Sequence, residues 1–181
     1  MSESSLASLF WTTRTVHMTS LAIRLLVFCM LLWLAVVDVR IRRLPNVAVL
    51  AIGVLFFVDA VVVRVSIREV VLHLALALGV FAVCAAMFAA RMLGGGDAKL
   101  AAVIFLWVGM DLSWSTLTLI SMIGTVVALI SLGARRLKPG QRSRPMRALT
   151  LFSSIRGVPY GVALALGGGA MIVLSAALPC S

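Results

Sequence analysis

The sequence predicts an all-α, polytopic membrane protein with about six transmembrane helices and with both termini outside. Hydrophobic residues make up 62% of the 181 residues and charged residues only 12%. In soluble domains about 45–50% of the residues are apolar and ~25% are charged. The mean hydropathy is +1.15. Apolar stretches that approach the ~20 residues needed to cross a bilayer recur along almost the whole chain. Lipid is therefore the expected solvent for most of the protein surface.

Six apolar stretches are expected to form the helices. Their approximate limits are residues 20–37, 47–63, 70–90, 98–110, 114–133 and 158–178. The fourth is short for a span, so we expect it to extend into the GGD before it or the DLSW after it. Residues 1–19 are expected to be a short N-terminal segment and residues 20–181 a single membrane domain. The first span ends in DVRIRR, and no removable signal peptide is expected.

The positions of the basic residues predict the orientation. Cytoplasmic loops of membrane proteins carry an excess of Lys and Arg, and an outside N-terminus places most of the 16 Lys and Arg residues inside. The outer side then keeps only Arg14, Arg24, Arg64 and Arg68. This asymmetry explains the net charge of +10 without nucleic acid, for which no binding motif is present. The basic segment 134–156 is expected to be an inner loop near anionic lipid headgroups.

Several residues inside the spans are expected to have structural roles. Asp59 and His73 lie toward the outer ends of neighbouring spans and are expected to have structural roles there, either reaching interfacial water or pairing with each other. The glycines at 167–169 are expected to let helices pack closely. Cys29, Cys84 and Cys180 form no C-x-x-C pair, so no metal site is expected. The side chains expected to anchor the protein at the membrane interfaces are Trp33, Trp107, Trp114 and Tyr160.

Only two of the six acidic residues lie on the inner side under this topology, Asp38 and Asp97. Two carboxylates held close together share one proton, because both cannot ionise cheaply. The ionised carboxylate takes a proton from an attacking water while the other donates to a peptide carbonyl, as in aspartic peptidases. The glycines at 94–96 would let a substrate backbone approach and would permit unusual φ and ψ angles beside Asp97.

A simpler explanation accounts for the same residues. Both acids would be interfacial charges paired with Arg40 or Lys99, and the glycines would form an ordinary loop. Helical periodicity alone favours this explanation. The glycine stretch is not a phosphate-binding loop, because G-x-x-x-x-G-K-[ST] does not fit.

Two motifs favour the catalytic interpretation. Asp38-x-Arg40-x-x-x-Leu44-Pro45-Asn46 resembles the D-x-R-x-x-x-I-P-N signature of the type IV prepilin leader peptidases, with Leu44 in place of Ile. The stretch GGGDAKL, from Gly94 to Leu100, resembles their G-x-G-D-x-K-L signature. VPYGVALALGG, which contains Pro159 and Gly161, is similar to the P-x-G-x-A-L-A segment that opens the family's last span. The resemblance extends from about residue 20 to the C-terminus.

The resemblance implies a G-x-G-D-type aspartic endopeptidase of the bacterial inner membrane, with Asp38 and Asp97 as the catalytic pair. The substrates would be prepilins and pilin-like pseudopilins, cut at the cytoplasmic face after a short basic leader. No metal or organic cofactor would be required. Pilus or secretion machinery would be a further partner. The supporting residues carried over from the motifs are Arg40, Pro45, Asn46, Gly94, Gly96, Lys99, Pro159 and Gly161.

Two features set this chain apart from the larger members of the family. Those members carry an N-terminal segment with paired C-x-x-C motifs and also N-methylate the new N-terminus, and neither is expected here. The size instead resembles the short branch that serves Flp-type, tight-adherence pili.

The supporting residues are open to ordinary interpretations. Lys99 is expected to anchor the fourth span at the headgroups rather than to hold Asp97. Pro45 and Asn46 are expected to make the turn that starts the second span, with Asn46 as a helix cap.

Two other classes of protein fit parts of the sequence. A small polytopic carrier would place its ionisable groups along a path across the bilayer, whereas both signature acids here lie at the inner boundary. A non-catalytic assembly factor of the pilus machinery would need neither aspartate.

Overall fold

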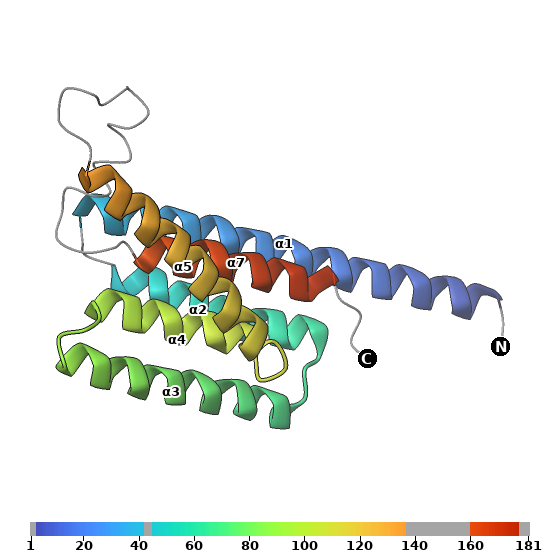
Figure 1. The fold of residues 1–181 in the computed structure, drawn as a ribbon. Helices are drawn as coiled ribbons and strands as arrows, with labels where there is room; N and C mark the ends of the chain where they lie inside the picture. Colours follow the sequence, from blue (N-terminus) through green and yellow to red (C-terminus); the bar gives the residue numbers. More distant parts are fainter. Residues whose placement is uncertain (1–2, 42–44, 137–159, 178–181) are drawn as a thin grey trace.

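The computed structural model describes residues 3–41, 45–136 and 160–177, and the side chains of 13–37, 45–129 and 161–176. The described residues form six α-helices and no strand, which confirms the predicted all-α class (Figure 1). Each helix overlaps most of one of the six predicted apolar stretches. The helices are α1 Glu3–Ile41, α2 Asn46–Val63, α3 Ile67–Ala89, α4 Gly95–Val108, α5 Ser113–Arg136 and α7 Tyr160–Ala177.

Helix α3 begins three residues before the predicted span because of a capping box. The Ser66 hydroxyl accepts a hydrogen bond from the Glu69 N–H at 3.3 Å, and the Glu69 carboxylate accepts from the Ser66 N–H at 3.0 Å. The S-x-x-E pattern satisfies backbone donors that would otherwise have no partner at the start of a helix. Arg64 ends α2 in the left-handed conformation, with φ 61°.

Helix α4 lies at the centre of the bundle. It starts at Gly95, so the expected extension into GGD is confirmed, and it ends at Val108 before Gly109, which has φ 70°. Its 14 residues span about 21 Å, less than the ~30 Å of a bilayer core. It contacts α2, α3, α5 and α7. After Asp97 and Lys99 near its start, its sequence is apolar on every face, as expected for a helix that is buried on most sides.

Three successive glycines of α7 bring the other helices close to it. A Cβ atom at Gly167 would meet Ile120 of α5 at 3.0 Å, one at Gly168 would overlap Ile104 of α4, and one at Gly169 would overlap Phe28 of α1. The predicted role of this segment in close packing is confirmed. Helix α7 is therefore the common surface against which α1, α4 and α5 pack.

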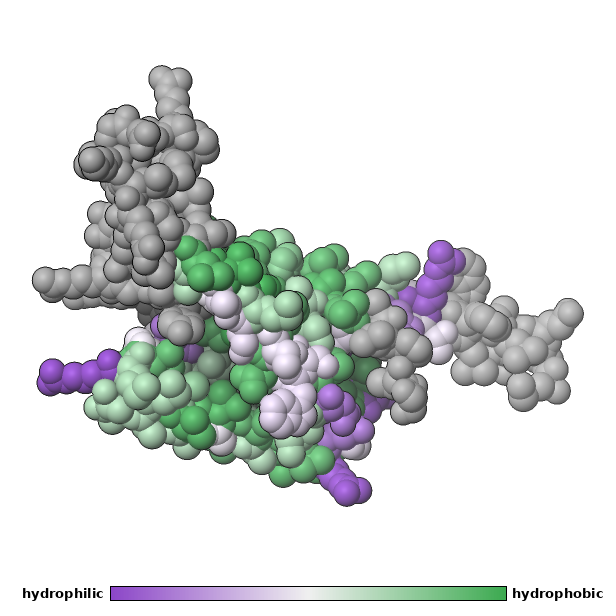
Figure 2. Space-filling view, in the orientation of Figure 1, coloured by the Kyte–Doolittle hydropathy of each residue, from purple (hydrophilic) through white to green (hydrophobic). Residues whose placement is uncertain are grey.

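Three of the six helices are long and apolar enough to cross a membrane, with candidate spans at Thr13–Val37, Asn46–Val63 and Ile67–Ala89. Helices α5 and α7 contain shorter apolar stretches, Ser113–Leu129 and Gly161–Ala176. Figure 2 shows apolar side chains over the middle of the visible face, with hydrophilic residues toward its two ends. This pattern is consistent with an integral membrane protein.

Candidate active site

The two signature motifs lie at the same end of the helical bundle. Asp38 belongs to the last turn of α1, and Asp97 to the first turn of α4. Figure 1 shows that α1 ends, α2 and α4 begin, and α7 begins at this one end, which we call the motif end. The α2–α3 and α4–α5 turns lie at the opposite end.

A hydrogen bond joins the two motifs directly. The Lys99 Nζ donates to the Asn46 Oδ1 at 2.8 Å, across 53 residues of sequence. Asn46 is the first residue of α2 and Lys99 lies in the second turn of α4, so the bond ties together the starts of two helices that run side by side. Lys99 therefore binds another protein side chain. The sequence alone suggests only an anchor at the lipid headgroups or a contact with Asp97.

Pro45 and Asn46 form the turn that starts α2, but not in the predicted roles. Pro45 occupies the cap position with φ −65° and ψ 120°, and no side chain caps the helix. The expectation that Asn46 caps α2 is wrong, because its side-chain oxygen accepts from Lys99 instead. Proline suits this position, since its fixed φ matches and it has no backbone N–H to satisfy.

The glycines before Asp97 make room for its carboxylate. A Cβ atom at Gly94 would lie 3.0 Å from the Asp97 Oδ2, and one at Gly95 would lie 3.2 Å from the Phe88 ring. The expectation of unusual backbone angles is wrong here, since none of the glycines at 94–96 has a positive φ. Within this connection the left-handed residue is Arg91, with φ 60°. Small size, rather than conformational freedom, is what Gly94 contributes.

Asp97 is placed at the boundary between the bundle interior and the motif end. Its side chain is half-buried, and its Oδ1 atom is shielded from solvent. The next residues of α4, Ala98 and Leu100, are buried. The first turn of a helix presents N–H groups that are not used within the helix, which is a favourable place for a negative charge. The start of α4 therefore holds a partly exposed carboxylate at the motif end.

The position of Asp38 follows from the helix that carries it. Ser20, Val27, Leu31 and Leu34 are buried on one stripe of α1. Position 38 comes one turn after Leu34, so it continues that stripe at the motif end. The side chains of Asp38 and of Arg40, which shares the last turns of α1, lie outside the described residues.

The segment similar to the family's last span also begins at the motif end. Gly161 is buried in the first turn of α7. Pro159 lies outside the described residues. The starts of α2, α4 and α7 thus meet where α1 ends, and each carries part of one of the three motifs.

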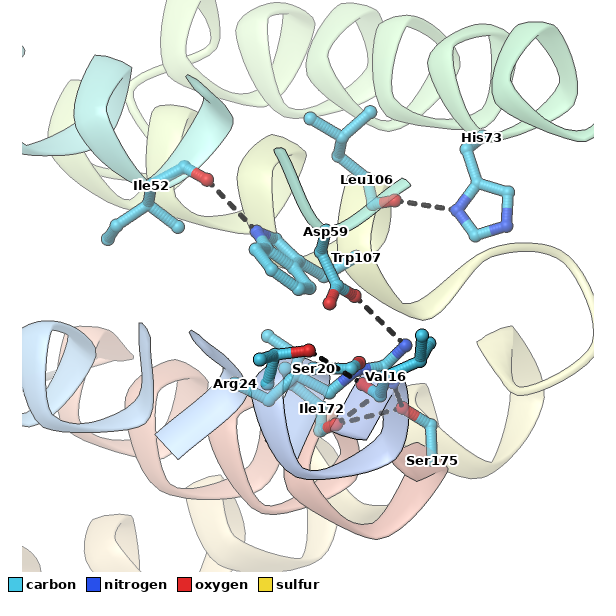
Figure 3. A network of polar contacts seen from close by, with 11 residues as sticks. Val16, Ser20, Arg24, Ile52, Asp59, His73, Leu106, Trp107, Ile172 and Ser175 are labelled. Atoms are coloured by element: carbon cyan, nitrogen blue, oxygen red, sulfur yellow. Dashed lines mark hydrogen bonds and ion pairs between the residues drawn. The ribbon is translucent and has the colours of Figure 1, made fainter. Parts of the chain in front are cut away.

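The predicted pairing of Asp59 with His73 is wrong. Asp59 forms an ion pair with Arg24 of α1, with 3.2 Å between Oδ2 and Nη2 (Figure 3). His73 donates from Nδ1 to the Leu106 carbonyl at 2.7 Å and stacks on Phe56. It thereby satisfies a carbonyl in the last turn of α4, where helix carbonyls lack partners in the helix itself.

Trp107 is a core residue rather than the predicted interfacial anchor. Its side chain is buried, and its Nε1 donates to the Ile52 carbonyl of α2 at 3.1 Å. Its ring packs edge-on against Phe56. Trp33 and Trp114 are exposed, as interfacial anchors would be. Together with Lys99 and Asn46, Trp107 and Ile52 fix α4 against α2 along their shared length.

Among the residues with described side chains, no group of three or more His, Cys, Asp and Glu residues is arranged to hold a metal ion.

Comparison with known proteins identifies the family. The sequence profile of the type IV leader peptidase family matches residues 25–129, more than half of the chain. The matched segment contains Asp38, Asn46, Asp97 and Lys99 and ends before the segment around Gly161. No curated protein and no solved structure matches the chain. On the length of this profile match, the chain belongs to the type IV leader peptidase family.

Proposed function

We propose that this protein is an aspartic endopeptidase that removes the basic leader of prepilins and pseudopilins at the cytoplasmic face of the bacterial inner membrane. Membership of the family implies prepilin leader cleavage. The observation that supports the proposal most directly is the bond between Lys99 and Asn46. It joins the motif that contains Asp97 to the motif that contains Asp38, so both aspartates belong to one end of the bundle.

In the proposed mechanism, Asp38 and Asp97 share a single proton. The ionised carboxylate removes a proton from a water molecule as the water oxygen attacks the carbonyl carbon of the scissile peptide bond. The protonated carboxylate donates its proton to the carbonyl oxygen. Collapse of the tetrahedral intermediate breaks the C–N bond, and the leaving nitrogen takes up a proton from the pair. The mechanism needs no metal ion and no organic cofactor.

The membrane position of the site suits a substrate with a short leader before an apolar helix. Asp97 lies at the boundary of an apolar bundle, so a peptide bond just outside an apolar segment would reach it while that segment stays in lipid. We propose the Flp-type, tight-adherence branch as the substrate class. We also propose that the reaction stops at cleavage, with no methylation of the new N-terminus.

Co-expression with a Flp-type prepilin from the same source tests the proposal. The wild-type protein should shorten the prepilin on a gel by the length of its leader. Asp38→Asn and Asp97→Asn should each reduce cleavage to below about 1% of the wild-type rate, because acid–base catalysis contributes roughly 10²–10⁴-fold. Asp111→Asn is the matched control, because Asp111 is an exposed aspartate in the α4–α5 turn at the opposite end.

Each result has a definite meaning, provided that membrane fractions contain equal amounts of every variant. Cleavage by either aspartate variant at the wild-type rate would disprove the two-carboxylate mechanism. If the wild type cleaves none of a panel of prepilins and pseudopilins, the protein is an assembly factor rather than a peptidase. Mass spectrometry of the cleaved pilin should show an unmethylated N-terminus, and a mass increase of one methyl group would refute that part of the proposal.

A further inference from the structure

A buried polar network ties three helices together far from the motif end (Figure 3). The Arg24 guanidinium of α1 pairs with Asp59 of α2 at 3.2 Å. It also donates to the hydroxyl of Ser175 and, at 3.4 Å, to the carbonyl of Ile172, both on α7. Its Nε donates to Ser20, one turn earlier in α1, at 3.3 Å. One side chain thus contacts α1, α2 and α7 at once.

The network lies too far from the candidate catalytic pair to contact the substrate bond. Arg24 precedes Asp38 by 14 positions on the same helix, which corresponds to about 21 Å. Asp59 lies in the last turns of α2, and α2 starts at the motif end. The side chains of Arg24 and Asp59 are only 18% and 6% exposed. Any effect on catalysis must therefore pass through the helices.

Stability alone is a weak reason for such a pair. Removing two charges from water costs free energy that their attraction does not always recover, and apolar residues of similar volume are often equally stable. Within membrane spans ionisable side chains are rarer still and usually have a function. A buried pair that contributes little to stability can instead specify how two helices align.

Between α1 and α7, the close contact of Phe28 with Gly169 is a second constraint on alignment. Between α1 and α2, the apolar sequences give little other information about alignment. From Leu21 to Val37, Arg24 is the sole charged residue of α1. From Val47 to Val63, Asp59 is the sole charged residue of α2. Exposed leucines such as Leu25 and Leu26 flank the buried ones on α1. A helix that slides by one residue would therefore exchange one apolar contact for another, whereas the ion pair forms in one alignment only.

The alignment of α1 at Arg24 determines the position and orientation of residue 38 at the motif end. Because α1 is continuous from Glu3 to Ile41, a slip of one residue moves position 38 by about 1.5 Å along the axis and turns it by about 100°. Either change would move the Asp38 carboxylate away from the place beside Asp97 that the proposed mechanism requires. Helix α2 starts only a few residues later, so its own alignment is coupled to the same end.

We propose that Arg24 and Asp59 are positioning residues, which set the alignment of α1 against α2 and α7 and thereby hold Asp38 in place for catalysis with Asp97. This inference rests on the proposed peptidase function.

The test compares a double variant with two controls in full-length protein reconstituted into lipid vesicles. Replacing one partner alone would leave a buried charge unpaired and endanger folding, so the main variant is Arg24→Leu with Asp59→Leu. Arg24→Lys is the conservative variant, because it keeps the charge that pairs with Asp59. The matched control is Arg68→Leu with Asp111→Leu. It also removes one positive and one negative charge, but from exposed positions at the end of the bundle opposite the motif end.

Two readouts are measured on each variant. The first is kcat and KM for leader cleavage of a purified prepilin. The second is the distance between nitroxide labels at Trp33→Cys of α1 and Leu174→Cys of α7, by double electron–electron resonance, with Cys29, Cys84 and Cys180 replaced by Ser. Trp33 and Leu174 are both exposed, so the labels leave the α1–α7 contact intact.

The double Leu variant should show a shifted or broadened distance distribution and a fall in kcat of about tenfold or more, because a 1 Å misplacement can cost roughly 10²-fold. KM should change far less, and Arg24→Lys and the matched control should keep the wild-type distances. A double Leu variant with wild-type distances, or with altered distances and wild-type kcat, overturns the inference. Absence of cleavage by the wild type refutes the proposed function instead, and the distances alone then decide whether the pair sets the alignment.

Discussion

At the residue scale, the space beside one glycine limits where the Asp97 carboxylate lies. Gly94 has an ordinary φ of −75°, so its backbone would accept any residue. Its Cβ position, however, is 3.0 Å from the Asp97 Oδ2, which is closer than normal carbon–oxygen contact. A methyl group there would displace the carboxylate without disturbing the helix that carries it.

Gly94→Ala should therefore reduce kcat for leader cleavage by about tenfold with little change in KM, because a misplacement of about 1 Å can cost roughly 10²-fold and the displacement here is smaller. Initial rates with a purified prepilin in lipid vesicles give both constants. Gly79→Ala is the matched control, since nothing lies within 4 Å of a Cβ at Gly79. A wild-type kcat for Gly94→Ala would show that the carboxylate tolerates the methyl group and that its position is not restricted by this contact.

The residue scale is also where prediction from the sequence was least complete. Asp38 and Asp97 were proposed as the catalytic pair because their neighbours match two motifs, and that role stays a prediction. The partner of Lys99 was not found, because hydrogen bonds between residues 53 positions apart leave no local pattern. Trp107 was assigned to the interface because it is near a span end, whereas α4 is short and central and so buries it.

At the element scale, the sequence predicted the limits of α2 and α5 closely, whereas α1 begins at Glu3, far before the predicted span at residues 20–37. The limits of α2 and α5 differ from the predicted spans by at most three residues. The start of α3 was missed because the S-x-x-E capping pattern at Ser66 was not considered. The sequence predicted a close helix contact only at the glycines of α7. It did not predict which helices pack there, because small residues indicate a close contact but not the partner helix.

Gly168→Ala tests that contact. The added methyl group would overlap Ile104 of α4, and overpacking of this kind typically costs about 1–3 kcal/mol. The free energy of unfolding, measured by sodium dodecyl sulfate titration in mixed micelles, should fall by that amount. Gly53→Ala, where nothing lies within 4 Å of the added atom, should not be destabilised.

A double-mutant cycle separates crowding at Gly168 from a general effect of alanine in α7. Ile104→Ala removes the atoms that the methyl group would overlap, so the double variant should be more stable than the sum of the two single changes by about 0.5–3 kcal/mol. Additive effects would mean that Gly168 and Ile104 do not contact each other.

At the scale of the whole molecule, the bundle has two chemically different ends. The motif end carries Asp97, Lys99 and Arg91 next to the start of α4, and the α5 helix that ends there finishes in Arg135 and Arg136. The sequence predicted this asymmetry from charge alone, because basic residues collect on the cytoplasmic side. The fold adds that the described helix ends predicted to lie on the inner side do lie at one end of the bundle. Which end faces the cytoplasm is a prediction that rests on the charges.

Labelling of single cysteines from outside tests the orientation through the two ends of α3. In a protein lacking Cys29, Cys84 and Cys180, Arg68→Cys lies in the first turn of α3 and Met92→Cys lies in the α3–α4 turn. Both native side chains are exposed. A membrane-impermeant maleimide added to intact spheroplasts should label position 68, and position 92 only after lysis. The reverse pattern would place Asp97 on the outer side, where a leader that stays in the cytoplasm cannot reach it. Because the two positions bracket one helix, they must give opposite results if α3 crosses the membrane. Equal labelling of both in intact spheroplasts would therefore contradict the membrane crossing of α3 as well as the orientation.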